Sequence, residues 1–239
     1  MRPYLRLLFS LVLASGALLI GESAALAQQP YYGPAYGPPP LPPGYYSPPP
    51  RRYAPAPYYY SPQAHEGFFV RFTLGVGYLS ASESYHGATL SYSGFGVTAG
   101  GALGGAVAPN LILFGEILGT SVINADQNYG GSLGSSGYDV EMYGFGPGIA
   151  YYLEPANLYF SGTLAFTKIS FSDTYSQYPA GDTNLGLGVS LMVGKEWWIG
   201  RRLGLGLAGQ LHLASMSDPS NSTRMTAAAV SLLGSLTFN

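Results

Sequence analysis

The chain has 239 residues, a formal net charge of −2 and no cysteine, and only 9% of its residues are charged. Soluble globular domains carry about 25% charged residues, so the composition argues against an ordinary cytosolic enzyme. A net charge near zero gives no reason to expect a nucleic-acid partner. The lack of cysteine excludes disulfides, thiolate metal sites and thiol nucleophiles.

The first 27 residues have the layout of a secretory signal peptide. Arg2 and Arg6 precede an apolar run of 14 residues, Leu7 to Ile20, and Ala25-Leu26-Ala27 forms a small-x-small cleavage site. The run is too short to span a bilayer as a helix. We therefore expect export and cleavage after Ala27, the alternative being an uncleaved inner-membrane anchor.

The next segment, residues 28–65, is dominated by proline and tyrosine. It holds 13 prolines and 9 tyrosines in 38 positions. Proline fixes φ and removes a backbone donor, so neither helix nor sheet can propagate. This composition predicts a disordered, extended arm. The alternative is an adhesive arm, centred on Arg51-Arg52-Tyr53, that contacts cell wall or protein.

The remaining segment, from Glu66 to Asn239, reads as β-strands throughout. Apolar and small residues alternate with period two, which is typical of strands that separate two environments. In the first stretch one face holds Phe68, Val70, Phe72, Leu74, Val76 and Tyr78, and the other holds Arg71, Thr73, Gly75 and Gly77. The pattern recurs over residues 185–194, 203–213 and 230–238.

Short and long connections alternate between these strands. The short turns are Ala108–Asn110, Glu154–Asn157 and Ile199–Arg202, and the longer polar stretches are Ala81–Thr89, Ile123–Gly137, Ser172–Thr183 and Ser217–Thr223. Three short turns and four long loops predict eight antiparallel strands.

The composition of the two faces predicts a membrane barrel. The second face is Gly, Ser, Thr and Ala with few charges, whereas a soluble barrel would present Lys and Glu to water. Placing Leu, Val and Phe against lipid and small or polar residues inside accounts for both faces. Closure also pairs every backbone group, which a bilayer requires. A soluble ligand-carrying barrel remains an alternative.

Aromatic side chains on apparent outward positions predict two interfacial girdles. These are Phe68, Tyr152, Trp197 and Phe238 near the short turns, and Tyr78, Phe95 and Tyr138 toward the long loops. With eight strands both ends of the barrel segment lie at the short-turn end. We expect that end, and the arm, in the periplasm.

At this point the segment Glu66–Asn239 resembles the small eight-stranded outer-membrane β-barrels, the OmpA transmembrane-domain and OmpX-like family. The resemblance rests on strand count, turn rhythm and the terminal strand, where Val230, Leu232, Leu236 and Phe238 match the family's alternating, aromatic-ended signal. Gly234 and the final Asn239 depart from that pattern. The resemblance implies an outer membrane of a Gram-negative bacterium and recognition by the barrel assembly machinery.

Several polar residues fall on apparent inward positions. They are Arg71, Glu116, Glu141, Gln210 and His212. An unpaired buried charge is costly, so we expect an internal network in which Arg71 faces Glu116, the alternative being a proton- or ion-conducting path. Inward Tyr143, Phe145 and Met192 favour a plugged interior, whereas the inward glycines favour space for a channel.

No catalytic, cofactor or metal site is predicted. His212 and Ser215 are three apart on one strand and therefore point to opposite faces. Gly204–Gly209 matches G-x-G-x-x-G but lacks the helix that gives the motif meaning. The loop acids Glu83, Asp126, Asp173, Asp182 and Asp218 are scattered rather than spaced as a calcium loop.

The leading functional interpretation is an integral outer-membrane protein that supports envelope integrity or surface interaction through its loops. The alternative is a narrow channel for small, including hydrophobic, molecules, and the third interpretation is a lipid-modifying enzyme. Expected partners are outer-membrane lipid, lipopolysaccharide, the assembly machinery and, through the arm, the cell wall. Nucleic acid is not expected.

Overall fold

A computed structural model describes residue 65 and residues 67–85, 88–176, 178–219 and 223–239. The predicted signal peptide and the predicted arm lie outside the described residues, apart from His65. No helix in the described ranges is long and apolar enough to cross a membrane.

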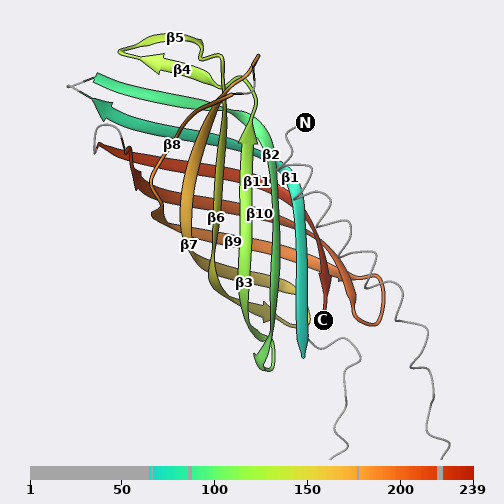
Figure 1. The fold of residues 1–239 in the computed structure, drawn as a ribbon. Helices are drawn as coiled ribbons and strands as arrows, with labels where there is room; N and C mark the ends of the chain where they lie inside the picture. Colours follow the sequence, from blue (N-terminus) through green and yellow to red (C-terminus); the bar gives the residue numbers. More distant parts are fainter. Residues whose placement is uncertain (1–64, 66, 86–87, 177, 220–222) are drawn as a thin grey trace, which may run out of the picture. The chain divides into compact units, whose positions relative to one another are not determined.

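Eight of the eleven strands in the described ranges form a closed antiparallel barrel (Figure 1). The barrel strands are β1 (Phe68–Tyr85), β2 (Ala88–Ala108), β3 (Leu111–Val122), β6 (Tyr138–Leu153), β7 (Leu158–Asp173), β9 (Gly186–Trp198), β10 (Leu203–Ser217) and β11 (Arg224–Phe238). Each pairs with its chain neighbours in the barrel, and β1 pairs with both β2 and β11, which closes the sheet. The all-β, eight-stranded prediction is confirmed.

The connections sort to two ends of the barrel. The short-turn end holds the turns before β3, β7 and β10, and Asn110 and Asn157 there adopt φ of 62° and 53°. Asparagine tolerates this left-handed conformation better than most residues, which suits tight turns. The loop end holds three further short strands, β4 (Asp126–Tyr129), β5 (Ser132–Ser135) and β8 (Pro179–Asp182).

One predicted long loop is mostly strand. β1 continues to Tyr85 and β2 begins at Ala88, and their pairing runs on from Ala81↔Tyr92 to Tyr85↔Ala88. The outward positions here are serine and threonine rather than apolar residues, so the sequence reads as loop although the ladder continues. The predicted loop Ile123–Gly137 likewise contains the β4–β5 hairpin.

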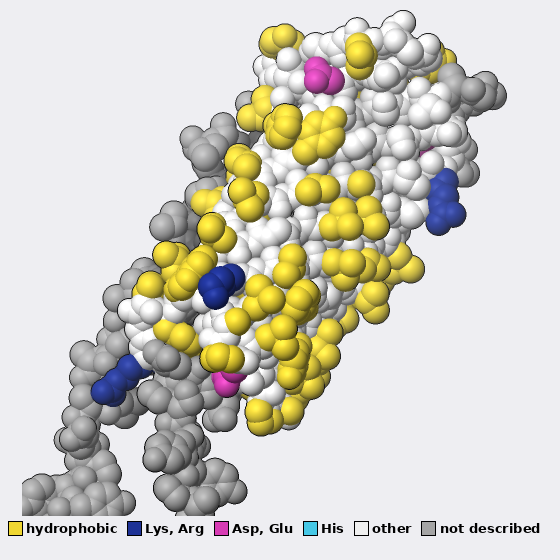
Figure 2. Space-filling view, turned by 180° about the vertical axis from the view of Figure 1, so that it is seen from behind, with side chains coloured by type: hydrophobic (Ala, Val, Ile, Leu, Met, Phe, Trp, Pro, Cys, Tyr) yellow, Lys and Arg dark blue, Asp and Glu magenta, His cyan; other side chains and the backbone are white. Residues whose placement is uncertain are grey.

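The outer surface of the barrel is apolar around its waist. Figure 2 shows hydrophobic side chains spread over the side of the barrel, with few charged groups among them. Exposed outward residues include Leu74, Val76, Phe95, Val97, Leu103, Ile117, Leu164, Leu187, Leu191, Leu205, Leu207, Val230 and Leu232. Soluble monomers rarely expose continuous apolar area on this scale, so the surface is one that faces lipid.

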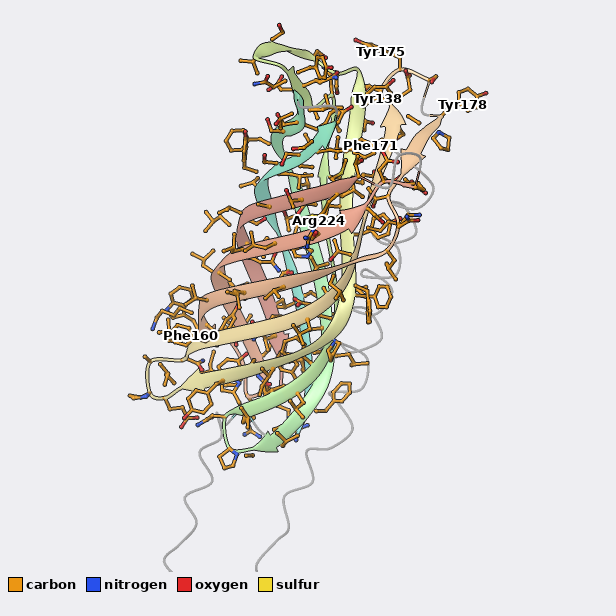
Figure 3. The ribbon with its side chains drawn as sticks, turned by 90° about the vertical axis from the view of Figure 1, so that its left-hand side faces the viewer. Tyr138, Phe160, Phe171, Tyr175, Tyr178 and Arg224 are labelled. Carbon is orange, nitrogen blue, oxygen red and sulfur yellow. The ribbon has the colours of Figure 1, made fainter. Side chains whose placement is uncertain are left out.

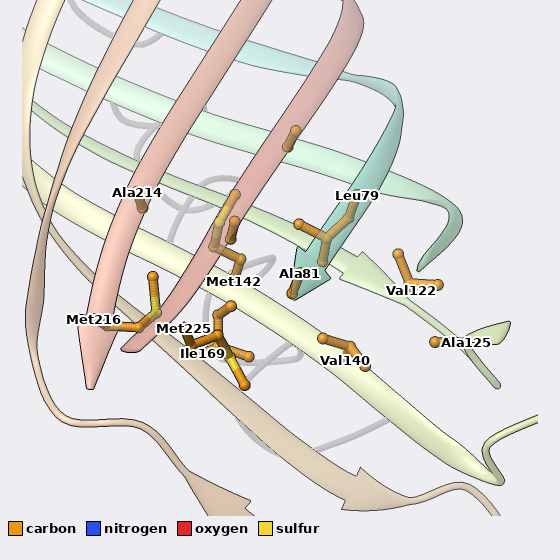
Figure 4. Close-up of a cluster of buried hydrophobic side chains, with 12 residues drawn as sticks. Leu79, Ala81, Val122, Ala125, Val140, Met142, Ile169, Ala214, Met216 and Met225 are labelled. Carbon is orange, nitrogen blue, oxygen red and sulfur yellow. The ribbon is translucent and has the colours of Figure 1, made fainter. Parts of the chain in front are cut away.

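Buried side chains fill the interior in layers. Toward the loop end lies an apolar cluster, shown in Figure 4, that includes Leu79, Val122, Val140, Met142, Ile169, Met216 and Met225. Tyr92 on β2 and Phe171 on β7 pack against it with ring centroids 5.1 Å apart. Because β2 and β7 are not neighbours, this ring contact crosses the interior and covers the cluster.

Candidate functional site

The strongest constellation of charged groups lies inside the barrel near the short-turn end. Arg71 on β1 is 2% exposed, and its Nη2 donates to Tyr152 Oη at 2.5 Å. Its Nε lies 3.6 Å from Glu196 Oε1, which forms a buried ion pair. The guanidinium also covers the Tyr159 ring at 3.9 Å from the centroid. We call Arg71, Glu196, Tyr152 and Tyr159 the arginine cluster.

The carboxylate of Glu196 is held by more than the arginine. Thr237 Oγ1 donates to Glu196 Oε1 at 2.6 Å, and Tyr152 Oη lies 3.3 Å from both carboxylate oxygens. A buried ion pair persists only where further hydrogen bonds satisfy the remaining donors and acceptors. The cluster therefore joins β1, β6, β7 and β9 through the interior, and Thr237 extends this cross-brace to β11.

The expected pairing of Arg71 with Glu116 is wrong. Glu116 is inside, as predicted, but its Oε2 accepts from Thr163 Oγ1 at 2.5 Å, while Arg71 pairs with Glu196. Glu196 was missed, although it shares the parity of Gly188, Ser190 and Gly194 along β9. Extending that alternation by one further inward position would have found it.

His65 lies at the same end and packs against the arginine cluster. Its ring stacks on Tyr152 with centroids 3.5 Å apart. Its Nε2 lies 2.6 Å from Asn157 Oδ1, and Asn239 Nδ2 lies 2.9 Å from its Nδ1. Donation by Nε2 and acceptance by Nδ1 fit the neutral imidazole. His65, three residues before β1, and Asn239, the last residue, thus meet at the short-turn end.

Burial lowers the pKa of the His65 imidazole below its usual value, and the hydrogen bond to Asn157 and the Glu196 carboxylate offset part of that effect. Desolvation disfavours the charged imidazolium. His65 is therefore held neutral at the mouth of the barrel, consistent with its hydrogen bonds.

A layer of hydroxyl and amide groups lies between the arginine cluster and the apolar cluster. Gln210 Nε2 donates to Ser190 Oγ at 2.9 Å, and His212 Nε2 lies 3.1 Å from Thr167 Oγ1. Thr98 Oγ1 lies 2.8 Å from Ser231 Oγ. The structure therefore places Gln210 and His212 inside the barrel, where Gln210 bonds to the neighbouring strand β9 and His212 reaches past β9 to β7, rather than to Arg71.

The predicted orientation of β6 is wrong throughout. Tyr152, expected in the outer girdle, is 0% exposed inside the barrel. Glu141, expected inside, lies on the outer face, where Ser121 Oγ approaches its Oε1 at 3.5 Å. Tyr143 and Phe145, also expected inside, are exposed. One error of parity accounts for all four residues, because a strand shifted by one position exchanges its faces.

Glycines on the inner face of β6 explain the true orientation. A Cβ at Gly148 would overlap the Phe114 ring from β3, and one at Gly146 would overlap the backbone of Leu164. Glu116 reaches Thr163 across this strand. The inner face of β6 is small because side chains from β3 and β7 lie over it.

The same relation holds at other inner glycines. A Cβ at Gly194 would lie 2.5 Å from Tyr159 Cζ, and one at Gly188 would lie between Thr167 Oγ1 and His212 Nε2. A Cβ at Gly77 would meet Ser231 and Thr98, which hydrogen-bond to each other above it. The expectation that inward glycines leave room for a channel is wrong at these positions, because a neighbouring side chain occupies each one.

The outer-face placement predicted for the girdle holds for four further residues, namely Phe68, Trp197, Tyr78 and Phe95. Phe68 and Trp197 are exposed near the short turns, and Lys195 Nζ lies 5.8 Å from the Trp197 ring centroid. Tyr78 and Phe95 are exposed toward the loop end. The prediction that Tyr138 belongs to the outer girdle is wrong, because Tyr138 is half-buried at the start of β6 on the inward parity of Val140.

The terminal strand keeps its predicted alternation. Val230, Leu232 and Leu236 are exposed, and Phe238 is half-buried near the short-turn end. Asn239 is buried, and its side-chain Nδ2 is within hydrogen-bond distance of His65 Nδ1. The departure from the family's terminal aromatic thus coincides with a contact that this chain makes.

The groups that hydrolysis or metal binding would require are not assembled among the described residues. His212 points inward to Thr167, whereas Ser215 lies on the outer face and accepts from Arg224. Within the described ranges no three His, Asp or Glu side chains are grouped as metal ligands. Asp182 is paired with Lys168 at 2.8 Å, which lowers the pKa of its carboxyl group, and Asp173 caps the turn at Ser176.

A closed barrel with an apolar waist, aromatic residues near both ends and a filled interior is a small outer-membrane type of β-barrel. No protein-family model and no curated protein matches the sequence. Solved structures do match. Neisserial surface protein A (NspA) aligns with a TM-score of 0.53 and 13% identity, over 72% of this chain and 96% of that chain.

Two further solved barrels align over similar lengths. Ail, the attachment invasion locus protein of Yersinia pestis, has 10% identity and a TM-score of 0.42 over 72% of this chain and 99% of its own. OprG of Pseudomonas aeruginosa has 13% identity and a TM-score of 0.41 over 74% and 99%. At 13% identity the likeness to NspA shows the fold: this chain has the fold of the small eight-stranded outer-membrane β-barrels.

Proposed function

We propose that the protein is a sealed outer-membrane barrel that supports the envelope or mediates surface interaction through its loops. The observation that carries the proposal is the filled interior. The arginine cluster, the layer of hydroxyl and amide groups and the apolar cluster each join strands that are not neighbours. Side chains also lie over inner glycines such as Gly77, Gly148, Gly188 and Gly194. Such a barrel supplies a rigid support rather than a wide aqueous path.

The loop end offers the exposed side chains that a surface role needs. Tyr175 is 85% exposed and Tyr178 is 74% exposed in the connection between β7 and β9, and Leu133 is 78% exposed on β5. Figure 3 shows Tyr175 and Tyr178 projecting at that end. Exposed tyrosines supply large contact area at low conformational cost, which suits them to recognition.

The orientation follows from the connections. We place the loop end outside the cell and the short-turn end in the periplasm, because outer-membrane barrels have short periplasmic turns. The proposal includes a signal peptide cleaved after Ala27, recognition of the terminal strand by the assembly machinery, and a Pro/Tyr-rich arm that contacts the cell wall. Outer-membrane lipid and lipopolysaccharide are the proposed surroundings, and the proposal assigns no catalytic step.

Conductance of the full mature chain in a planar bilayer tests the sealed interior. A heat-dependent shift in gel mobility first shows that the barrel is folded. We expect no steady current steps from the wild type, and reproducible steps from Tyr159→Ala combined with Phe114→Ala, which removes two rings from the interior. Equal steps from both proteins would refute the sealed barrel.

The second candidate is a passage for small apolar molecules, and the methionines of the apolar cluster favour it. Met142, Met216 and Met225 line the interior toward the loop end. Unbranched thioether side chains adapt to irregular apolar ligands. Uptake of an uncharged aromatic dye into vesicles distinguishes a passage from a sealed barrel. A passage gives uptake that increases in proportion to the amount of barrel protein in the vesicles. A sealed barrel gives no more uptake than vesicles without protein.

A further inference from the structure

The outer face of four adjacent strands changes from apolar to polar toward the loop end. On β2, β1, β11 and β10 the outward residues are largely apolar up to Phe95 and Tyr78, whose rings meet edge to face with centroids 5.1 Å apart. Beyond this pair most outward positions carry hydroxyl groups. We call them the hydroxyl patch: Ser80, Ser82, Ser84, Thr89, Ser91, Ser93, Ser215, Ser217 and Thr226.

The sheet register aligns these residues across the strands. Ser91 is opposite Ser82, Ser82 is opposite Thr226, and Thr226 is opposite Ser215. The hydroxyls of Ser82 and Thr226 lie 3.2 Å apart. At the usual strand spacing this row spans about 14 Å. The patch is therefore a continuous polar area directly next to the lipid-facing belt.

The hydroxyl patch contains one positively charged side chain. Arg224, the first residue of β11, is exposed on the outer face, and its Nε donates to Ser215 Oγ at 2.7 Å (Arg224 is labelled in Figure 3). That bond uses one of the five N–H donors of a guanidinium. Arginine binds phosphate in a forked, two-bond geometry that its planar group suits.

Arg224 differs in its electrostatic surroundings from the other charged residues at the loop end. Among the described outward positions of these four strands beyond the aromatic pair, Arg224 is the charged side chain. Of the acidic residues at the same end, Glu83 points inward and accepts a hydrogen bond from Thr223, and Asp182 pairs with Lys168 on β7. Asp126 is exposed on β4 opposite Ser93, at the β2 edge of the patch, three strands away from Arg224 on β11. An anion is therefore attracted at the β11 edge of the patch, where Arg224 lies beside Ser215.

We propose that the hydroxyl patch and Arg224 bind the phosphorylated sugar headgroup of an outer-leaflet glycolipid. The guanidinium binds a phosphate, and the serine and threonine hydroxyls bond to the sugar. The acyl chains then run down over Tyr78 and Phe95 onto the apolar belt. Because the patch is continuous with the apolar belt, a lipid with a phosphorylated headgroup fits it better than a soluble anion does. The inference rests on the proposed membrane placement with the loop end outside.

Native mass spectrometry of the full mature chain in detergent tests the site, with bis-phosphorylated diglucosamine lipid as the probe and its dephosphorylated form as comparison. We expect the wild type to retain the phosphorylated form preferentially. Arg224→Ala should lower retention about tenfold, which corresponds to about 1.4 kcal/mol. Arg224→Lys should recover part of it. Lys168→Ala is the matched control, since it removes an exposed cation of the same end that Asp182 already pairs, and should leave retention unchanged.

The outcomes separate this inference from the one on which it rests. If Arg224→Ala and wild type retain the lipid equally, or if both lipid forms bind equally, the site is refuted. Complete displacement by inorganic phosphate would also refute it, because the ligand would then be the free anion. A folded chain that does not insert into vesicles would refute the proposed function, whereas insertion without phosphate-dependent retention refutes this site alone.

Discussion

Replacing Glu196 with glutamine should destabilise the barrel by about 3 kcal/mol, because it leaves Arg71 buried without a countercharge. Glutamine keeps an oxygen for the Thr237 hydroxyl, so the change isolates the charge. Breaking a buried pair on one side generally costs about 3–5 kcal/mol. The lower end applies here because Arg71 keeps the Tyr152 hydroxyl and the Tyr159 ring.

A double-mutant cycle measures this energy. Urea unfolding in one detergent compares wild type, Glu196→Gln, Arg71→Met and the double variant. The double variant should recover most of the loss, since it buries no unpaired charge. Lys168→Met with Asp182→Asn is the control cycle on an exposed pair, where the coupling should be below about 1 kcal/mol. A cost of Glu196→Gln below about 1 kcal/mol, or no recovery in the double variant, would contradict the cross-brace.

Two further predictions concern packing and pH. Gly194→Val should destabilise the barrel by about 1–3 kcal/mol, because its Cβ would overlap the Tyr159 ring. Gly209→Val, with open space beyond its Cβ on the outer face, should be close to neutral in urea titrations; equal losses at both sites would refute the covering of inner glycines. Burial lowers the pKa of His65, so its contribution to stability is present above the unfolded pKa of about 6.5 and decreases as pH falls toward the folded value. Wild type should therefore lose more unfolding free energy than His65→Gln between about pH 7.5 and about pH 5, and parallel pH profiles would show that His65 is not held neutral.

The strands could be predicted because a bilayer imposes a simple rule on the outer face. Leu205, Leu207 and Leu213 alternate with small residues, and lipid on one side leaves little else for those positions. The interior obeys a different rule, in which each position is small or large according to its neighbour. Along β6 the glycines and Tyr152 share the inner face, so the size of individual residues does not indicate which way the strand faces.

The candidate site was harder to predict because its contacts, like the sizes of the interior residues, depend on neighbouring strands. Arg71 and Glu116 both lie inside, but which carboxylate reaches the guanidinium depends on strand register and on the depth of each residue. His65 carries no periodic signal at all, since it precedes β1 and is positioned by Asn157 and Asn239 from distant parts of the chain. Such contacts depend on closure of the barrel, which no local pattern encodes.

The covered glycines have a consequence for engineering. Strand number sets the diameter of this barrel, but the free bore depends on the side chains of the interior, among them rings that lie over glycine backbone, Phe114 over Gly148 and Tyr159 over Gly194. Truncating those rings leaves a bare wall with no side chain to take their place. The bore of this scaffold is therefore adjustable by truncating side chains in its interior layers, without adding a strand.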